Sequence, residues 1–267
     1  MERQPQVVDF KQVRGVVDFV WLRTTCAHNG VHLEEKQLQL LEGFVVRLLE
    51  WNKKVNLISR RDEENIWTSH VLHCLGLVFK VEIPNGARVL DLGTGGGLPG
   101  VVLRIVRPDL SFTLLDSTQK KVNVVKDLLR SLDLSGVDAV WGRAEDLGKQ
   151  PAHAGHYDVV VARAVAPLKD LVRWSFPFLR KNATMDSIRK ETPPTASKKQ
   201  INGPGLVAYK GGDLDGEIRQ AKKQPNVGQI SIVDLTLNGS TQLGDADKKI
   251  VVVEYVWSID RKPNNRE

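Results

Sequence analysis

The sequence of 267 residues predicts an α/β fold, in which helices cover both faces of a mostly parallel sheet with an antiparallel edge. From residue 88 onward, short apolar runs alternate with amphipathic segments, which is the pattern of parallel strands joined by helices. A glycine-rich turn, Gly93 to Gly100, follows the first apolar run directly. Residues 1–80 instead carry apolar side chains at helical spacing. These observations indicate a Rossmann-like sheet that binds a nucleotide at the carboxyl ends of its strands, with a helical amino-terminal extension.

The extension is predicted from two sets of apolar residues three or four positions apart. They are Phe10, Val13, Val17 and Val20, and then Leu38, Leu41, Val45 and Leu48. Pro84-Asn-Gly-Ala then marks the change to alternating strands and helices.

The elements of the sheet region follow from the apolar runs and the amphipathic segments between them. The predicted strands are Arg88–Leu92, Phe112–Asp116, Val137–Trp141, Tyr157–Ala162, Leu206–Lys210, Ile230–Leu235 and Ile250–Trp257. The predicted helices are Gly100–Val106, Gln119–Leu132, Leu168–Leu179 and Leu214–Lys223. Only a short connection, Asn238 to Lys249, joins the last two strands, so we expect them to be antiparallel at one edge.

The predicted organisation is a helical extension over residues 1–83, a sheet domain over 84–260 and a tail over 261–267. Residues 182–204 hold three prolines and few large apolar side chains, which is typical of a flexible surface insertion. The basic pairs Arg189-Lys190 and Lys198-Lys199 leave open an alternative in which this segment contacts RNA.

Composition limits the class of protein. With 41% hydrophobic and 26% charged residues the chain is globular, and two cysteines make no disulfide framework, so we expect a reducing, cytoplasmic environment. No apolar run approaches the roughly 20 residues that span a membrane, and no secretory signal is visible. The net charge of +6 lies mostly in residues 81–267 and fits either a polyanionic partner or an ordinary surface.

Acidic residues near the glycine turn favour S-adenosylmethionine over a dinucleotide. Asp91 lies inside the strand, where a dinucleotide fingerprint usually has an apolar residue. Asp116 ends the second strand, where a carboxylate can accept both ribose hydroxyls, although it could instead cap the following helix. The third strand ends at Arg143-Ala-Glu145, where backbone and Glu145 can meet an adenine edge.

Two cations follow the fourth and fifth strands. Arg163 and Lys210 stand where a nucleotide-binding sheet faces the reacting group, although both could be surface charges. A guanidinium binds a phosphate or the O6/N7 edge of guanine with paired hydrogen bonds. Guanine N7 carries a lone pair and no proton, so its methylation needs placement rather than a base. The pattern therefore suits methylation of guanine N7.

Two groups of His and Cys could be mistaken for metal ligands. They are His70, His73 and Cys74, and Cys26, His28 and His32. Neither group supplies four ligands at a familiar spacing, so we expect packing or surface roles and no metal. Trp51, Asn52 and Asn56 are expected to fix the helical extension rather than to stack on a base.

The chain resembles the RsmG family, also called GidB, of small-subunit rRNA guanine-N7 methyltransferases. The resemblance covers most of residues 36–260, and its motifs occur in order. They are Trp51-Asn-Lys-Lys-Val-Asn-Leu57, Asp91 to Gly100, Leu115-Asp-Ser-Thr118 with Lys120-Lys121, Arg143-Ala-Glu145, Ala162-Arg-Ala164 and Tyr209-Lys-Gly211. It implies a class I methyltransferase fold, S-adenosylmethionine as donor, and a guanine in the 530 loop of 16S rRNA as acceptor.

The resemblance also guides the choice of site residues. For the cofactor we expect Asp91, Gly93, Gly95, Gly97, Leu98, Asp116, Ser117, Thr118, Ala144, Glu145 and Arg163. For RNA we expect Lys120, Arg143 and Lys210, and for the transfer step Arg163 and Lys210. The expected partner is 16S rRNA, in the small ribosomal subunit or its precursor, and the protein is expected to act as a monomer.

The chain departs from the family pattern in two places. The family often has His-x-x-Asp-Ser-Leu in the extension, where this chain has His70-Val-Leu-His-Cys-Leu75. The insertion at 182–204 replaces what is usually a short turn. Two other functions stay open: a nicotinamide-dependent oxidoreductase, which Asp91 and the lack of a Tyr/Lys relay disfavour, and a non-catalytic RNA-binding protein of ribosome assembly.

Overall fold

A computed structural model describes residues 19–181, 198–238 and 247–257. Its centre is a seven-stranded sheet with the strand order β4-β3-β2-β5-β7-β9-β8. The strands are β2 (Arg88–Leu92), β3 (Ser111–Asp116), β4 (Val137–Trp141), β5 (Val159–Arg163), β7 (Gly205–Gly211), β8 (Val227–Asp234) and β9 (Lys248–Tyr255). The five strands from β4 to β7 are parallel, whereas β9 is antiparallel to β7 and β8. The predicted sheet and its antiparallel edge are therefore confirmed.

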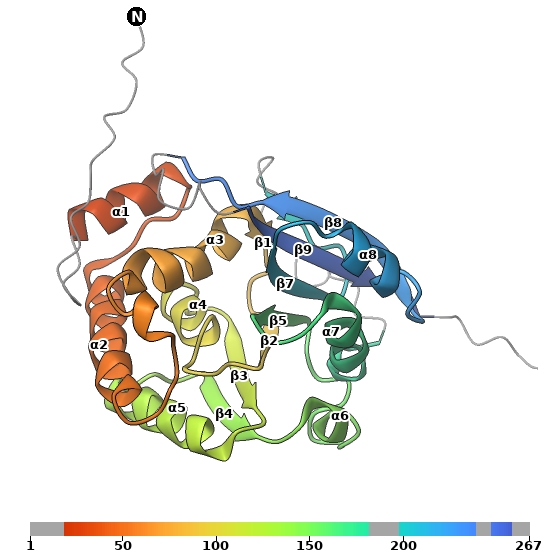
Figure 1. Ribbon diagram of the computed structural model, residues 1–267, viewed down its shortest axis with the longest axis horizontal. Coiled ribbons are helices and arrows are strands. Elements are labelled where there is room, and N and C mark those ends of the chain that lie inside the picture. The colour runs from red at the N-terminus through yellow and green to blue at the C-terminus, as the bar shows by residue number, and fades with distance from the viewer. Residues whose placement is uncertain (1–18, 182–197, 239–246, 258–267) are drawn as a thin grey trace, which may run out of the picture.

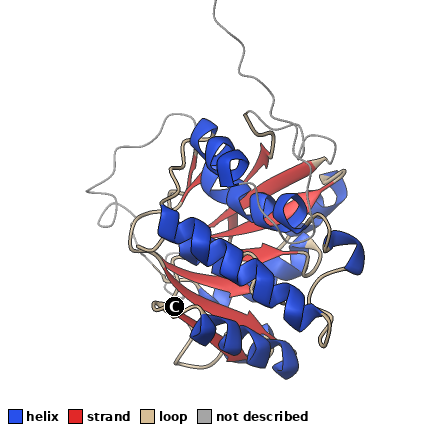
Figure 2. Ribbon diagram, turned by 90° about the vertical axis from the view of Figure 1, so that its left-hand side faces the viewer, coloured by secondary structure: helices blue, strands red, loops and turns tan. Residues whose placement is uncertain are grey.

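Helices cover both faces of the sheet (Figures 1 and 2). Their bounds are α1 (Phe19–His28), α2 (Glu35–Asn52), α3 (His73–Lys80), α4 (Gly100–Val106), α5 (Gln119–Ser131), α6 (Ala144–Leu147), α7 (Leu168–Ser175) and α8 (Asp215–Ala221). Helices α2 to α5 pack on one face, around side chains such as Leu41, Phe44 and Val101. Helices α6 to α8 cover the other face, around Leu147, Leu171 and Ala221. We call these the α2–α5 face and the α7–α8 face.

The helical extension belongs to the same apolar core as the sheet. The residues of α2 that were predicted to share a face, from Leu38 to Leu48, are all buried, and α2 contacts α4 and α5. Of the earlier apolar set, Phe10, Val13 and Val17 lie outside the described residues, and Val20 in α1 is 74% exposed, so it is not part of the core. The division at residue 83 stays a prediction.

Short elements complete the fold. A 3₁₀ turn at Arg60–Asp62 precedes a π-helical turn at Trp67–Leu72, which continues directly into α3. Strand β1 (Val81–Glu82) pairs in parallel with β6 (Lys199–Gln200). The predicted insertion therefore includes two residues that are paired in a sheet, and its residues 182–197 lie outside the described part. Helix α7 ends at Ser175 rather than at the expected Leu179, because a 3₁₀ turn, Phe176–Phe178, contains Pro177.

No helix in the described ranges is long and apolar enough to cross a membrane. Both cysteines are buried and free.

Candidate cofactor and substrate cleft

The glycine turn lies at the carboxyl edge of the sheet, between β2 and α4. The backbone N–H groups of Gly93 and Thr94 donate to the carbonyl of Leu115 on β3, at 2.8 and 2.9 Å. Gly93 has a φ of +77°, and a Cβ there would lie 2.5 Å from Val165 Cγ2. Only glycine satisfies both the backbone conformation and the close approach.

Asp91 is buried in the core next to this turn and does not line the cleft. Its side chain is fully buried, and Oδ2 accepts hydrogen bonds from Thr94 Oγ1 at 2.7 Å and from Gly100 N at 2.8 Å. Burial raises the pKa of Asp91 to about 6, against the lowering effect of these hydrogen bonds and of Arg163. The structure therefore gives Asp91 a part in the shape of the turn, and its direct contact with a cofactor stays a prediction.

The turn also rests on the helical extension. A Cβ on Gly96 would lie 2.9 Å from Leu48 Cδ1 on α2 and 3.2 Å from Leu57 Cβ. At Gly97 the aromatic carbon Phe44 Cε2 would be 3.5 Å away. The glycine turn is therefore packed between the sheet and α2.

Asp116 ends β3 on the opposite side of the turn. Its Oδ2 accepts from Gly95 N at 2.9 Å, and its Oδ1 accepts from Thr118 N at 2.8 Å. A carboxylate oxygen has two acceptor positions, so each oxygen keeps one for a ligand. The bond to Thr118 orders the residues just before α5, but the N-cap of α5 is Thr118 itself, so Asp116 is not the helix cap that the sequence left open as an alternative.

Two adjoining hollows form a cleft along this edge, with volumes of about 260 and 420 Å³. Gly93, Asp116, Ser117 and Val165 line both of them. Of the predicted site residues, the cleft also brings together Gly95, Leu98, Thr118, Arg143, Ala144, Glu145 and Arg163. Asp91, Gly97, Lys120 and Lys210 do not line it. A larger hollow of about 780 Å³ lies apart from the glycine turn, between α5 and β4.

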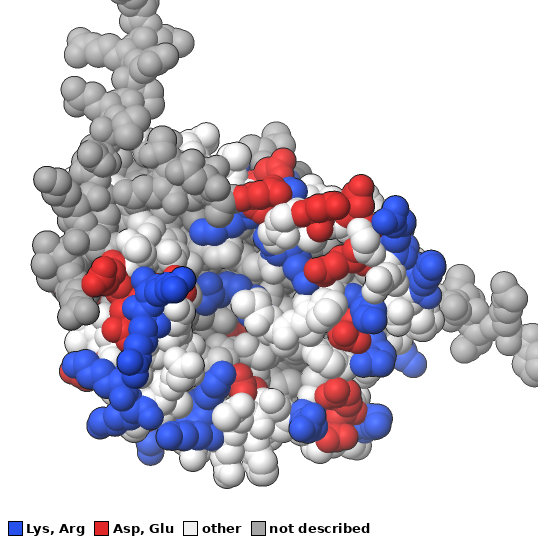
Figure 3. Space-filling view, viewed as in Figure 1, with Lys and Arg blue, Asp and Glu red and all other residues white. Residues whose placement is uncertain are grey.

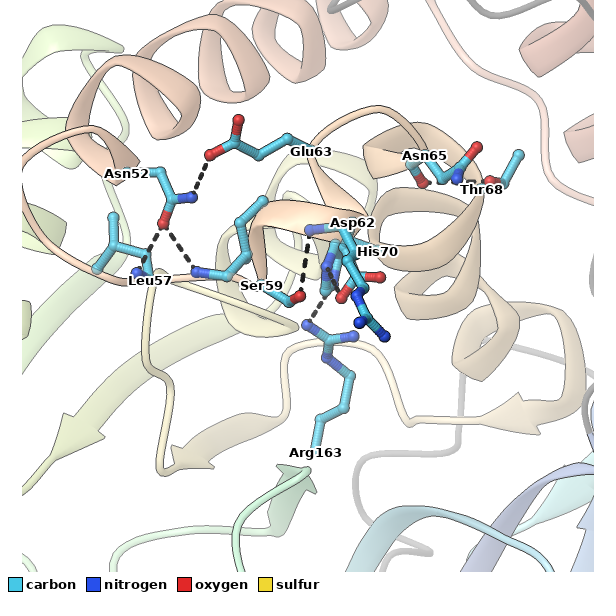
Figure 4. Close-up of polar contacts among 11 residues, drawn as sticks. Asn52, Leu57, Ser59, Asp62, Glu63, Asn65, Thr68, His70 and Arg163 are labelled. Carbon is cyan, nitrogen blue, oxygen red and sulfur yellow. Dashed lines mark hydrogen bonds and ion pairs between the residues drawn. The ribbon is translucent and has the colours of Figure 1, made fainter.

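Arg163 enters the cleft at the end of β5, where a histidine holds it (Figure 4). Arg163 Nη2 lies 2.9 Å from His70 Nδ1, and His70 Nε2 lies 3.5 Å from Asp62 Oδ2. Because the guanidinium can only donate, Nδ1 accepts and the proton of the neutral imidazole sits on Nε2, facing Asp62. Burial and the charge of Arg163 lower the pKa of His70 to about 4. His70 is therefore neutral at pH 7.

His70 was expected to have a packing or surface role, so the sequence interpretation missed its contact with Arg163. The signal that could have found it is the family pattern, because this chain keeps that first His and differs at His73 and Cys74. His70 lies in the π-helical turn, and such turns are frequent at functional sites.

Asn52 fixes the loop that covers the cleft from the α2 side (Figure 4). Its Oδ1 accepts from the backbone N–H groups of Leu57 and Ile58, at 2.7 and 3.0 Å. Its Nδ2 donates to Glu63 Oε1 at 2.6 Å. Trp51 Nε1 donates to Asp127 on α5 at 3.1 Å, so both residues have the structural contacts that the sequence predicted.

Lys210 points to the α7–α8 face, away from the cleft. Its Nζ lies 2.7 Å from Glu217 Oε2 on α8 and donates to the carbonyl of Ala166 at 2.9 Å. Glu217 Oε2 also accepts from Leu168 N at 2.7 Å. Burial acts to raise the pKa of Glu217, but the bonds from Lys210 and Leu168 outweigh it and lower that pKa. Lys210 thus anchors the segment after Arg163, and its proposed contact with RNA stays a prediction.

That anchored segment carries a strained residue. Ala164 has a φ of +56°, which is uncommon outside glycine, and Val165 beside it is 37% exposed between the two hollows. Strained backbone of this kind persists only where surrounding contacts fix it, and it concentrates at ligand sites.

Basic side chains gather around the hollow on the surface over α2 and α5, as Figure 3 shows. The exposed cations that lie in α5, or between α2 and the π-helical turn, are Lys53, Lys54, Arg60, Arg61, Lys120, Lys126 and Arg130. Such a surface fits a nucleic-acid backbone. In the part of the chain that the structure describes, no group of three or more His, Cys, Asp or Glu side chains could hold a metal ion.

Comparison with known proteins shows what the chain is similar to. Residues 37–200 match the model of a family named GidB and described as rRNA small subunit methyltransferase G. The Ribosomal RNA small subunit methyltransferase G of Caldanaerobacter subterraneus subsp. tengcongensis is 40% identical over 238 residues, which cover 89% of this chain and 90% of that protein. Its namesake from Moorella thermoacetica is 37% identical over 194 residues, or 73% of this chain and 72% of the relative.

Proposed function

Since the chain belongs to the GidB family of rRNA small subunit methyltransferase G proteins, we propose that it transfers a methyl group to N7 of a guanine in the 530 loop of 16S rRNA. Membership confirms the predicted class of enzyme, an rRNA methyltransferase that uses S-adenosylmethionine. The target base and atom, the small ribosomal subunit or its precursor as partner, the monomeric state and a cytoplasmic place of action are parts of the proposal.

The cleft fits the cofactor. S-adenosylmethionine supplies an activated methyl group when it is bound. Asp116 keeps one acceptor position on each oxygen for ribose hydroxyls, and a Cβ on Gly95 would meet nothing within 4 Å, so the turn leaves room for a ligand. Ala144 and Glu145 line the other end of the cleft, where an adenine would lie.

One observation carries the choice of guanine N7: Arg163 is held at the wall of the cleft, and no lining side chain is placed as a free base. Among the described lining residues, His70 Nδ1 already accepts from Arg163, and each oxygen of Asp116 accepts from a backbone N–H group and keeps its other acceptor position for a ribose hydroxyl. Glu145 lies at the adenine end, in the other hollow from Arg163. Methylation of N7 removes no proton before transfer, so positioning by Arg163 suffices.

The test uses small ribosomal subunits that lack the modification. The protein and labelled S-adenosylmethionine are added, and N7-methylguanine is mapped by chemical strand cleavage of the rRNA. We expect one new cleavage in the 530 loop with the wild-type protein and at least a 100-fold lower rate with Arg163→Ala. Lys223→Ala, which changes an exposed lysine far from the cleft, is the matched control and should react at the wild-type rate.

New cleavage at no guanine, with an active positive control, would contradict the proposal. Titration with S-adenosylmethionine and with NAD tests the two alternatives left open by the sequence. A methyltransferase binds the former in the presence of excess NAD, whereas a non-catalytic RNA-binding protein binds neither.

A further inference from the structure

The register of the sheet determines which cations point to the α2–α5 face beside the cleft. Arg163 lines one of the two hollows, and Lys248 lines neither. Arg163 on β5 pairs with Tyr209 on β7, and two residues further along β7 Gly211 pairs with Lys248 on β9. Side chains of paired residues point to the same face, and those of successive residues to opposite faces. Tyr209 belongs to the core of the α2–α5 face, so Arg163 and Lys248 both point to that face.

The neighbouring lysines, Lys210 and Lys249, point to the opposite face, and their ammonium groups already have partners. Lys210 and Lys249 pair with each other in the register and lie on the α7–α8 side. Lys210 contacts Glu217 and the carbonyl of Ala166, as described above. Lys249 Nζ lies 2.8 Å from Asp247 Oδ1 and donates to the carbonyl of Gly212 at 3.0 Å. Neither is available to a ligand in the cleft.

On the cleft face, both cations keep unused donors. Arg163 Nε is buried and has no hydrogen-bond partner, although Nη2 is bound to His70. Lys248 is partly buried, and no described carboxylate lies within ion-pair distance of its Nζ. Burial and the charge of Arg163 lower the pKa of Lys248, while Asp62 acts in the opposite direction. The two positive charges are therefore close enough to repel each other.

The imidazoles beside the two cations add no further positive charge. His70 and His73 both have a lowered pKa, about 4 and about 3, so these imidazoles are neutral at pH 7. Gly211 lies on the strand between Arg163 and Lys248 and places no side chain there, and a Cβ at this position would lie 2.9 Å from the backbone oxygen of Asp247. Neighbouring strands lie about 4.8 Å apart and each residue rises about 3.3 Å, so two strand spacings and an offset of two residues put the two backbones about 12 Å apart. Their long side chains can still converge on one small group.

We propose that Arg163 and Lys248 together bind one backbone phosphate of the RNA beside the guanine that is methylated. The inference rests on the proposed function for the identity of the RNA. Arg163 supplies a planar donor fork held by His70, and Lys248 supplies a compact charge from the far side. The proposal places Lys248 beside Arg163, whereas the contact of Lys210 with RNA stays a prediction.

The experiment measures binding of a labelled stem-loop RNA with the 530-loop sequence at several salt concentrations. We expect Lys248→Ala to weaken binding about tenfold and to reduce the salt dependence by about one counterion, with Lys248→Arg close to wild type. Lys249→Ala removes the same charge from the next residue on the opposite face, and it should bind like the wild type. The affinity for S-adenosylmethionine should be equal in all four proteins.

A second set of RNAs locates the phosphate. In each RNA one phosphate next to the target guanine is replaced by a neutral methylphosphonate. At one position the wild type should lose about tenfold in affinity, whereas Lys248→Ala should lose nothing further. The proposal is overturned if no position couples to Lys248, if Lys249→Ala matches Lys248→Ala, or if Lys248→Ala weakens the cofactor instead of the RNA. If the wild type binds the RNA but methylates no guanine, the proposed function is wrong. The phosphate site is then still tested, because the effects of the methylphosphonate and of Lys248→Ala on RNA affinity can be compared.

Discussion

At the scale of single residues, Asp91 shows how a buried acid supports the turn that lines a site. In Asp91→Ala, Thr94 Oγ1 and Gly100 N lose their acceptor in a buried place. We expect the free energy of unfolding to fall by about 2–4 kcal/mol, measured by urea denaturation, with weaker cofactor binding. Asp91→Asn keeps one acceptor oxygen and should lose less.

The control for Asp91 is an acid of the same sheet. Asp138 on β4 is exposed, so Asp138→Ala should change stability by less than about 0.5 kcal/mol. Equal stability of the two alanine variants would show that the Asp91 contacts contribute nothing.

His73 is expected to make the free energy of unfolding depend on pH. Burial, followed by the charges of Arg163 and Lys248, lowers its pKa to about 3, below the ordinary value of 6.5. The folded state therefore favours the neutral ring: its contribution is complete above pH 6.5 and is lost as the pH falls toward 3. Urea denaturation between pH 7 and 5 should show the wild type losing stability more steeply than His73→Gln, by up to about 1 kcal/mol per pH unit.

His28, in the last turn of α1, is a suitable comparison, and His28→Gln should follow the wild-type pH profile. Parallel profiles for wild type and His73→Gln would contradict the assignment. Acid denaturation as a whole also includes Asp91, whose raised pKa acts in the opposite direction.

At the scale of elements, the segment between β5 and α7 depends on a contact with α8. Lys210 and Glu217 together hold Ala166 and Leu168, and hence the strained Ala164 and the exposed Val165 beside the cleft. Lys210→Ala and Glu217→Gln should each slow methyl transfer, and the double variant should be little slower than either. A double-mutant cycle should give a coupling energy of about 0.5–3 kcal/mol.

The salt dependence of RNA binding separates this anchoring role from a direct contact. If Lys210 only anchors the segment, Lys210→Ala keeps the wild-type salt slope. A slope reduced by about one, with no coupling to Glu217, would instead show that Lys210 contacts a phosphate.

Much of the element pattern was predictable because it depends on local sequence. The apolar runs gave β2 and β4 with their observed bounds, and α4 likewise, since glycine and proline delimit them. The face to which Lys210 points was not predicted, because it depends on strand register, and the sequence interpretation considered only position along the strand. The pairing of β1 with β6 joins residues more than 100 positions apart, and no local pattern indicates it.

For the cleft as well, some residues were predictable from the sheet pattern, and others depend on segments that are distant in the sequence. Residues of the glycine turn and the ends of β3 and β5 were predictable, because a parallel sheet brings the carboxyl ends of its strands to one edge. His70, Asp62 and Lys248 were not, since they reach this edge from a π-helical turn, a 3₁₀ turn and an antiparallel strand.

At the scale of the whole molecule, the helical extension packs against the cofactor turn. Leu48 of α2 is fully buried and lies against Gly96. Leu48→Ala should lower the free energy of unfolding by about 2–4 kcal/mol and weaken cofactor binding, measured by denaturation and calorimetric titration. Val46 lies on the same helix but is 42% exposed, so Val46→Ala should leave both quantities nearly unchanged. If Leu48→Ala lost stability but kept the wild-type cofactor affinity, the packing of α2 on the glycine turn would have no effect on cofactor binding.

The packing of α2 against α4 also has a consequence during synthesis. Helix α2 ends at Asn52, whereas α4 begins at Gly100, so the ribosome completes one partner before it has made the other. At about 5–20 residues per second, the apolar side of α2 waits several seconds for the surface that covers it. During this interval Leu41, Phe44 and Leu48 of the nascent chain are not yet covered by α4. The chain can bind the cofactor only after α2 and α4 have packed together.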